Sequence, residues 1–272
     1  MSDRERTGRY EYKYALPVSA RAQVLELAEA HVKPDPHANP LPEGATGYNV
    51  HSLYFDTPDL RDYHERLEGY RVRDRLRIRT YDKPGDNRPV FLENKRKLFD
   101  RVVKHRVKIC TVDEWMAEDS PTPWARFTDR LKGRKRYAAG TFRTLVERGG
   151  RVPVSCVHYR REVYVAAEPG STVRLTLDRD LTAATRPGVK ELFAAPDVAL
   201  IPPDWMVMEL KFSGDRPGWM RRIIRELGVR ASPVSKFGLS VVLGRRADRP
   251  VEVRFFTPRP LRPPRPARMV AG

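Results

Sequence analysis

Basic side chains occupy every second position of the segment RVRDRLRIRT. The alternating residues are Arg73, Arg75, Arg77 and Arg79. Because successive side chains of a β-strand point to opposite faces, a strand here places all four arginines on one face and Leu76 and Ile78 on the other. Guanidinium groups in such a row suit an anion that offers several oxygens. One isolated strand of this kind is more often the solvated face of a half-buried sheet.

The same alternation recurs in other segments. Glu93, Lys95 and Lys97 alternate in FLENKRK, and Lys104, Arg106 and Lys108 alternate in VVKHRVKI. Further strand-like segments contain Glu11 with Lys13, Arg161, Arg174 with Thr176 and Asp178, and Glu209 with Lys211. A solvated sheet face mixes both signs of charge to limit repulsion, whereas these faces are mainly positive with isolated carboxylates. We therefore expect them to share a polyanionic ligand.

A chain of phosphates fits such a set of side chains. Enclosing many unpaired cations costs several kcal/mol per ion, so an anion should accompany them. Arg offers bidentate geometry to phosphate and Lys a point charge. Glu209 is then either a salt-bridge partner of Lys211 or an oxygen ligand for Mg²⁺ or Mn²⁺, and spacing leaves both open. Glu11 and Glu93 pose the same choice, with the salt bridge favoured.

The segment SPVSKFGLSVVL resembles the start of a helix. Ser235 is suited to cap its N-terminus, which would place Lys236 in the first turn, beside backbone N–H groups that can face an anion. A lysine there more often faces solvent, and the position is mildly unfavourable without an anion.

The overall charge also points to polyanions. Lys and Arg number 52 against 35 Asp and Glu, which gives a net charge of +17 and a pI near 10.2. Nucleic acid, anionic membrane and polyphosphate would all be attracted. No run of about 18 apolar residues and no N-terminal apolar region occurs, so we expect no membrane span or secretory signal, and a cytoplasmic location.

Period-two patterns predict eight strands, which suffice to close a barrel. The strand segments are 9–15, 50–56, 71–81, 89–97, 101–110, 154–166, 172–179 and 205–213, and the helical segments are 19–32, 121–148 and 217–227. We expect an α+β fold in which a closed antiparallel eight-stranded β-barrel is decorated with helices. Cys110 and Cys156 lie in strand segments without a metal-binding spacing, so we interpret both as core residues.

The chain divides into a body, residues 1–249, and a tail, residues 250–272. The tail contains six prolines and five arginines against one acid, Glu252. Such a composition is typical of extended, poorly ordered segments. The body alone remains strongly cationic, so we predict one domain followed by a disordered tail.

Nine short motifs in this order resemble the VTC domain, a member of the triphosphate tunnel metalloenzyme group. They are RYEYKY, SLYFDTPDL, the segment 63–69, RDRLRIRTY, FLENKRK, YRREVY, VRLTLDR, VMELKF and SKFG. The resemblance extends over about residues 9 to 243. The related cyclase and thiamine-triphosphatase branch starts with an ExExK motif, whereas this chain has Arg9, Glu11 and Lys13, as the VTC branch would.

The resemblance implies a set of site residues. The residues gripping the reacting phosphates would be Lys13, Arg77, Arg79, Lys95, Arg161 and Arg174, and those binding further phosphates Lys104, Lys211, Lys236, Arg75 and Arg106. Glu209 would hold the metal, with Glu11 and Glu93 as further candidates. Tyr159 resembles a position that stacks on a nucleotide base, although a core tyrosine is the more usual role.

The implied activity is that of a polyphosphate polymerase, which moves the γ-phosphoryl group of a nucleoside triphosphate, ATP above all, onto inorganic polyphosphate with Mn²⁺ or Mg²⁺. Two alternatives remain open: a metal-dependent triphosphatase or tripolyphosphatase, and a non-catalytic polyanion-binding module. Specific nucleic-acid binding is disfavoured because the basic residues alternate with apolar ones and not with exposed aromatics. A membrane partner and the oligomeric state are left open.

Overall fold

The computed structural model describes residues 9–41, 44–82, 87–99, 101–120, 122–232 and 234–245. The predicted disordered tail, residues 250–272, lies outside them. Every pairing between the described strands is antiparallel, and all of the strands belong to one sheet. None of the described helices is long and apolar enough to cross a bilayer.

Eight long strands form the body of the sheet. In spatial order they are β1 (Arg9–Pro17), β12 (Trp205–Ser213), β10 (Arg174–Thr185), β9 (Val152–Ala166), β4 (Thr46–Asp56), β6 (Leu76–Tyr81), β7 (Pro89–Leu98) and β8 (Arg101–Thr111). Four short strands pair with them: β2 (Val32–Pro34), β3 (Asn39–Pro40), β5 (Val72–Arg73) and β11 (Val198–Ala199). Each of the eight predicted strand segments overlaps a long strand, although the segment 71–81 is interrupted between β5 and β6.

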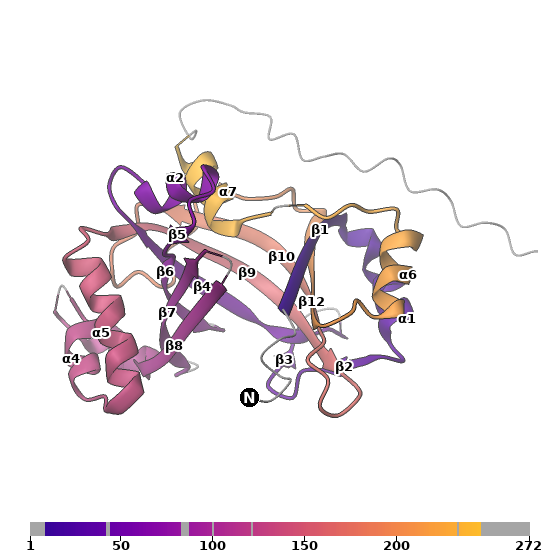
Figure 1. The fold of residues 1–272 in the computed structure, drawn as a ribbon, viewed down its shortest axis with the longest axis horizontal. Helices are drawn as coiled ribbons and strands as arrows, with labels where there is room; N and C mark the ends of the chain where they lie inside the picture. Colours follow the sequence, from indigo (N-terminus) through magenta and orange to yellow (C-terminus); the bar gives the residue numbers. More distant parts are fainter. Residues whose placement is uncertain are drawn as a thin grey trace, which may run out of the picture.

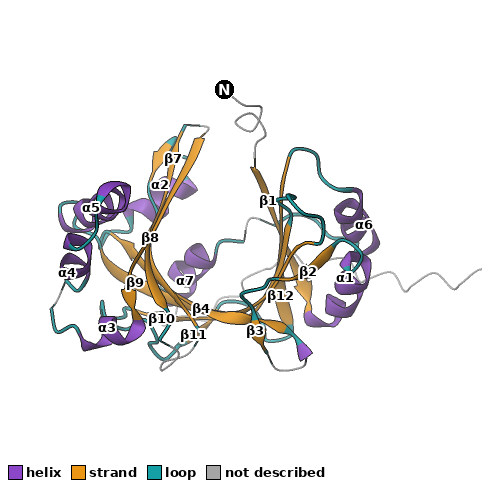
Figure 2. Ribbon diagram, turned by 90° about the horizontal axis from the view of Figure 1, so that it is seen from below, coloured by secondary structure: helices purple, strands orange, loops and turns teal. Residues whose placement is uncertain are grey.

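The prediction of a closed barrel is wrong, because the sheet is open. Within the described residues the outer strands β1 and β8 do not pair. Figure 2 shows that the sheet forms a trough. We call the side with β7 and β8 the first wall and the side with β1 and β12 the second wall. The cations of the two walls line the same cavity, and their like charges repel one another. The alternation of side chains along each strand is the same in an open and a closed sheet, so the sequence pattern does not distinguish between the two.

Helices cover the outer faces of both walls (Figure 1). The first wall is covered by α3 (Val112–Ala117), α4 (Trp124–Asp129) and α5 (Gly133–Glu147), and the second by α1 (Arg21–Ala28), which follows a 3₁₀ turn at Val18–Ala20, and α6 (Gly218–Glu226). At one end of the trough lie α2 (Arg61–Leu67) and α7 (Lys236–Gly244), joined through Tyr63 and Phe237. The sequence predicted α1, α6 and the start of α7, merged α4 with α5, and missed α2 and α3.

The alternation of the strands divides apolar from charged side chains. Leu76 and Ile78 of β6 are fully buried in the core beneath the helices of the first wall, and Arg77 and Arg79 point to the inside of the trough. The cores of both walls therefore lie outside the trough, and its inner surface is left to polar groups. Cys110 and Cys156 are free and buried, which confirms their interpretation as core residues.

Candidate active site

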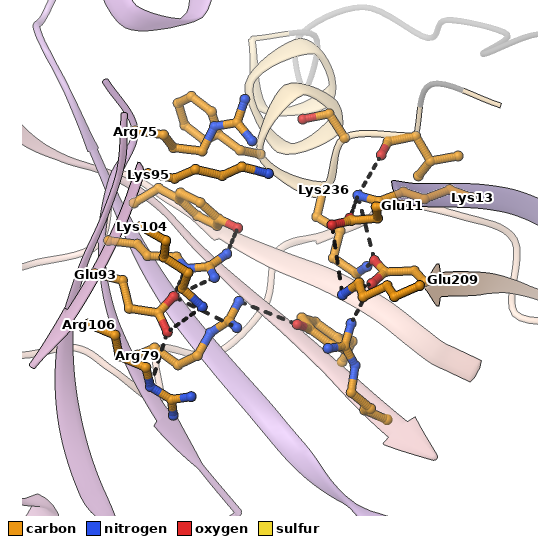
Figure 3. A pocket seen from close by; sticks show the side chains of 18 of the residues that line it. Glu11, Lys13, Arg75, Arg79, Glu93, Lys95, Lys104, Arg106, Glu209 and Lys236 are labelled. Carbon is orange, nitrogen blue, oxygen red and sulfur yellow. Dashed lines mark hydrogen bonds and ion pairs between the residues drawn. The ribbon is translucent and has the colours of Figure 1, made fainter. Parts of the chain in front are cut away.

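A cavity of about 300 Å³ occupies the trough, and twelve lysines and arginines and three glutamates line it. All fifteen site candidates are among the lining residues: Lys13, Arg75, Arg77, Arg79, Lys95, Lys104, Arg106, Tyr159, Arg161, Arg174, Lys211, Lys236, Glu11, Glu93 and Glu209. Figure 3 shows that the labelled side chains converge from both walls. We call this space the cationic cavity. Arg73, Lys97 and Lys108, which continue the alternation along their strands, are not among its lining residues.

Glu209 organises the cations of the second wall. Its Oε1 lies 3.0 Å from Nζ of Lys236 and 3.6 Å from Nζ of Lys13, and its Oε2 lies 2.9 Å from Nζ of Lys211 and 3.3 Å from Nη2 of Arg161. Burial would raise the pKa of this carboxyl group, but the four cations outweigh it and hold the pKa well below its usual value. Glu209 is therefore ionised, with two cationic neighbours on each of its oxygens.

Asp178 fixes two of the same cations from behind the cavity. Its carboxylate accepts Nε of Arg161 at 2.6 Å and Nη2 at 2.7 Å, and lies 2.6 Å from Nζ of Lys236. Sequence reasoning placed Asp178 on the polar face of its strand but gave it no role. The only indication was its alternation with Thr176 and Arg174, which does not separate a buried ion-pair partner from a surface acid.

Glu93 organises the cations of the first wall. It faces Arg77 of β6 and Arg106 of β8 in register, and it forms ion pairs with Arg77, with Arg106 at 3.3 Å and with Lys104 at 3.4 Å. Burial opposes its ionisation, yet the charges of Arg77, Arg79 and Lys104 hold its pKa far below the usual range. The geometry favours the salt-bridge role for Glu93 over that of a metal ligand.

Two neighbouring cations lack a carboxylate. Arg75 and Lys95 exchange both backbone hydrogen bonds at 3.0 Å, so their side chains leave the backbone side by side, and neither forms an ion pair within the described chain. Burial lowers the pKa of Arg75 to about 10 and also lowers the pKa of Lys95, with nearby cations adding to both shifts. Adjacent like charges are unfavourable, so this is where an added anion would relieve most repulsion.

Aromatic hydroxyl groups support the guanidinium groups. Tyr54 accepts a hydrogen bond from Nη1 of Arg77 at 3.0 Å. Burial would raise the pKa of Tyr54, but the positive charges of Arg77 and Arg79 lower it to about 8. Arg174 donates from Nη2 to the hydroxyl of Tyr48 at 2.9 Å and to Asp35 at 3.2 Å.

Tyr159 lies in the floor of the cationic cavity and is only 4% exposed. Its ring is covered by Arg161 and Lys236, at 5.2 Å and 4.7 Å from the ring centroid, and its hydroxyl accepts from Arg79 at 3.4 Å. A base could stack on this ring only if those cations moved. Contact between Tyr159 and a nucleotide base therefore stays a prediction.

Several lining residues were not predicted. They are Tyr48, Tyr54, Arg66, Tyr81, Val234, Ser235 and Phe237. The tyrosines lie in strands, where a sequence does not distinguish a site residue from a core residue. Arg66 lies on α2, a helix too short to give a clear period. Ser235 was predicted only as a helix cap, and its Oγ does accept from the backbone N–H of Gly238 at 3.1 Å.

The acidic side chains fit a metal ion only together with a substrate. No group of three His, Cys, Asp or Glu side chains within the described residues is arranged to hold a metal. Glu209 and Glu11 both lie within 4 Å of Lys13 and Lys211 and face the cationic cavity. Mg²⁺ commonly uses one or two carboxylates and completes its shell with phosphate oxygens and water. This donor set suits an ion that enters with phosphates.

Sequence comparison agrees with this geometry. The sequence pattern of the VTC domain matches residues 8–243. The chain belongs to the VTC domain family. A search of curated proteins found no match to this chain. Among solved structures, this chain is similar to HpAC1 from Hippeastrum, which is named as a putative adenylyl cyclase and described as having a dominant triphosphatase activity. The two are 20% identical, with 87% of this chain and 96% of that chain covered and a TM-score of 0.45.

Proposed function

We propose that this VTC domain protein is a polyphosphate polymerase that transfers the γ-phosphoryl group of a nucleoside triphosphate, ATP above all, to the end of a polyphosphate chain. The observation that carries the proposal is the cationic cavity, in which twelve basic side chains face three glutamates. A linear polyphosphate offers negative charge at every unit and can contact both walls. Because ATP is the donor, the proposal also places the protein in the cytoplasm.

The low pKa values of the three glutamates in the cavity fit transfer to phosphate, which needs no carboxylate base. The pKa values of Glu11, Glu93 and Glu209 are all lowered, because nearby lysines and arginines outweigh the effect of burial. A carboxylate with such a low pKa is a weak general base near neutral pH. A terminal phosphate is already anionic and needs no base. This supports a polymerase over a hydrolase.

Catalysis in this proposal is electrostatic. Lys13, Arg161, Lys211 and Lys236 would hold one phosphate group against the second wall, and Arg75, Arg77, Arg79 and Lys95 another against the first. Donors fixed by Glu209, Asp178 and Glu93 need little reorganisation when charge builds up on the transferred group. Mg²⁺ or Mn²⁺, held by Glu209 and Glu11 with the substrate phosphates, would neutralise part of that charge.

One assay distinguishes the proposal from both alternatives. Purified protein is incubated with ATP and Mn²⁺, and the products are separated on a polyacrylamide gel. Long polyphosphate chains support the polymerase. Orthophosphate without chains would instead assign a triphosphatase, and unchanged ATP together with tight tripolyphosphate binding would assign a binding module.

A further inference from the structure

Exposed apolar side chains gather at the outer end of the β7–β8 hairpin. Six of the ten large hydrophobic residues that are exposed in the described chain lie here: Leu67, Tyr70, Val72, Phe99, Val102 and Val103. Leu67 and Phe99 are each 61% exposed, Val102 55% and Tyr70 53%. We call these six residues the apolar tip. Contiguous exposed apolar surface on a folded domain usually marks a contact surface.

Backbone pairing brings the two segments of the apolar tip together at one end of the sheet. Val72 of β5 lies opposite Leu98 at the end of β7, and the N–H of Phe99 donates to the carbonyl of Arg71 at 2.7 Å. Val102 of β8 lies opposite Lys97 of β7. The chain from α2 to β5 is thus held against β7. Because paired residues share a face and successive residues alternate, Val72 and Val102 lie on opposite faces, and the apolar tip is an edge with exposed apolar side chains on both faces.

Basic residues outnumber acidic ones around the apolar tip. In the two stretches 67–73 and 97–104 they are Arg71, Arg73, Lys97, Arg101 and Lys104, against the acids Glu68 and Asp100. Within those stretches Arg71, Arg101 and Lys104 are exposed. Long basic side chains beside apolar ones can keep their charge at a lipid headgroup while the apolar groups enter the interface.

The positive charge around the apolar tip distinguishes between its possible binding partners. A second copy of the chain would bring two basic surfaces together, and the tail 250–272, with five arginines and one glutamate, carries the same sign of charge. A bilayer with anionic headgroups instead matches both the apolar residues and the surrounding cations. We propose that the apolar tip docks this protein onto an anionic membrane surface.

Docking at this point would set the orientation of the cationic cavity. Val102 and Lys104 are two residues apart on β8, so both face the inside of the trough, and Lys104 lines the cavity. The wall that holds Glu93 and its cations therefore ends at the apolar tip. A phosphate chain bound along this wall would lie beside the membrane surface.

The test is co-sedimentation of the full chain with vesicles of phosphatidylcholine, with and without phosphatidylglycerol. We expect binding only with phosphatidylglycerol, and about 10-fold weaker binding for Phe99→Ser and for Val102→Ser, as expected when one inserted side chain is lost. Met116→Ser, which removes a residue that is 52% exposed on α3 beyond the other end of β8, is the matched control and should bind like the wild type.

A second measurement distinguishes docking by the apolar tip from nonspecific attraction of the whole chain, whose net charge is +17, to anionic vesicles. Both native cysteines are buried, so a cysteine introduced by Phe99→Cys can carry an environment-sensitive dye, with Met116→Cys as control. A blue shift on anionic vesicles at position 99 alone supports docking by the apolar tip. Equal shifts at both positions, no vesicle binding by the wild type, or a solution dimer that Phe99→Ser dissociates would each overturn the proposal.

Discussion

The ammonium group of Lys236 lies 3.0 Å from Oε1 of Glu209, and so joins the first turn of α7 to the middle of β12. The same ammonium lies 2.6 Å from Asp178 of β10. These two carboxylates raise the pKa of Lys236 despite the opposing effect of burial. A lysine in a helix's first turn is unfavourable on its own, and here two buried acids compensate for it.

Lys236→Met should therefore destabilise the fold as well as weaken substrate binding. Removing one partner of a buried ion pair commonly costs about 3 kcal/mol, because the remaining charges lose their compensation. Urea denaturation of the apo protein measures the change. Lys95→Met, at a lysine without an ion pair in the described chain, should stay within about 0.5 kcal/mol of the wild type. Equal stability of the two variants would contradict a structural role for Lys236.

Arg75 and Lys95 should contribute to ligand binding without contributing to apo stability. Their side chains repel one another until an anion arrives, so Lys95→Met should weaken tripolyphosphate binding about 10-fold and leave the melting temperature of the apo protein unchanged or higher. Titration calorimetry and thermal melting measure the two quantities.

Arg77→Met is the contrasting variant. Arg77 pairs with Glu93 and Tyr54, so this change should reduce both tripolyphosphate affinity and apo stability. If Lys95→Met kept full affinity, the pair formed by Arg75 and Lys95 would not be part of the anion site.

Period-two alternation was sufficient to place the strands and the charged lining residues that lie on them, whereas Lys236 and Tyr159 were chosen from the resemblance to the VTC domain. Arg77 and Arg79 face inward for the same reason that Leu76 and Ile78 face the core. Glu93 was recognised in the sequence as an isolated carboxylate among cations. In the structure it lies opposite Arg77 and Arg106 on the neighbouring strands, which accounts for its role as their ion-pair partner.

Closure of the sheet was not predictable in this way. Whether β8 meets β1 depends on contacts between segments about ninety residues apart and on the charge between the walls, which alternation does not encode. Arg66 was missed because it reaches the cavity from α2, and Asp178 because burial of an acid depends on which cations the neighbouring strands supply.

Polyphosphate affinity should fall as the pH rises through about 8. Partial burial in the cavity wall lowers the pKa of Lys104 to about 8, with the charges of Arg77 and Arg79 acting in the same direction against that of Glu93. Below this pH Lys104 is charged and attracts phosphate, and above it the attraction is lost. Tyr54, whose pKa is also about 8, gains a negative charge over the same range.

Lys104→Arg separates the contribution of Lys104 from that of Tyr54, because an arginine stays charged over the whole pH range of the measurement. We expect its affinity to fall less between pH 7 and about 9 than that of the wild type, and Tyr54→Phe to remove a further part of the fall. Binding isotherms at a series of pH values give the comparison. An identical pH dependence for wild type and Lys104→Arg would exclude Lys104 as the titrating group.

A histidine pair outside the cavity should make the fold acid-sensitive. Nδ1 of His51 lies 2.7 Å from Nδ1 of His158, and Nε2 of His51 lies 2.6 Å from the carbonyl oxygen of Asp82. Because a carbonyl only accepts, His51 carries its hydrogen on Nε2, and its Nδ1 accepts from His158. Burial, with the charge of His158, lowers the pKa of His51 to about 4, so the ring is neutral in the folded protein at neutral pH.

Below pH 6.5 the unfolded chain takes up a proton on His51 that the folded protein does not take up until about pH 4. The free energy of unfolding should therefore fall across this window, by up to about 3 kcal/mol at about 1.4 kcal/mol per pKa unit. Urea denaturation from pH 7 to about 4 should show a shallower fall for His51→Gln than for the wild type. His37→Gln, at an exposed histidine, is the control and should keep the wild-type slope. A slope unchanged in His51→Gln would mean that the fall comes from the carboxylates of the cavity, since ion-paired acids such as Glu93 also lose their charge as the pH drops.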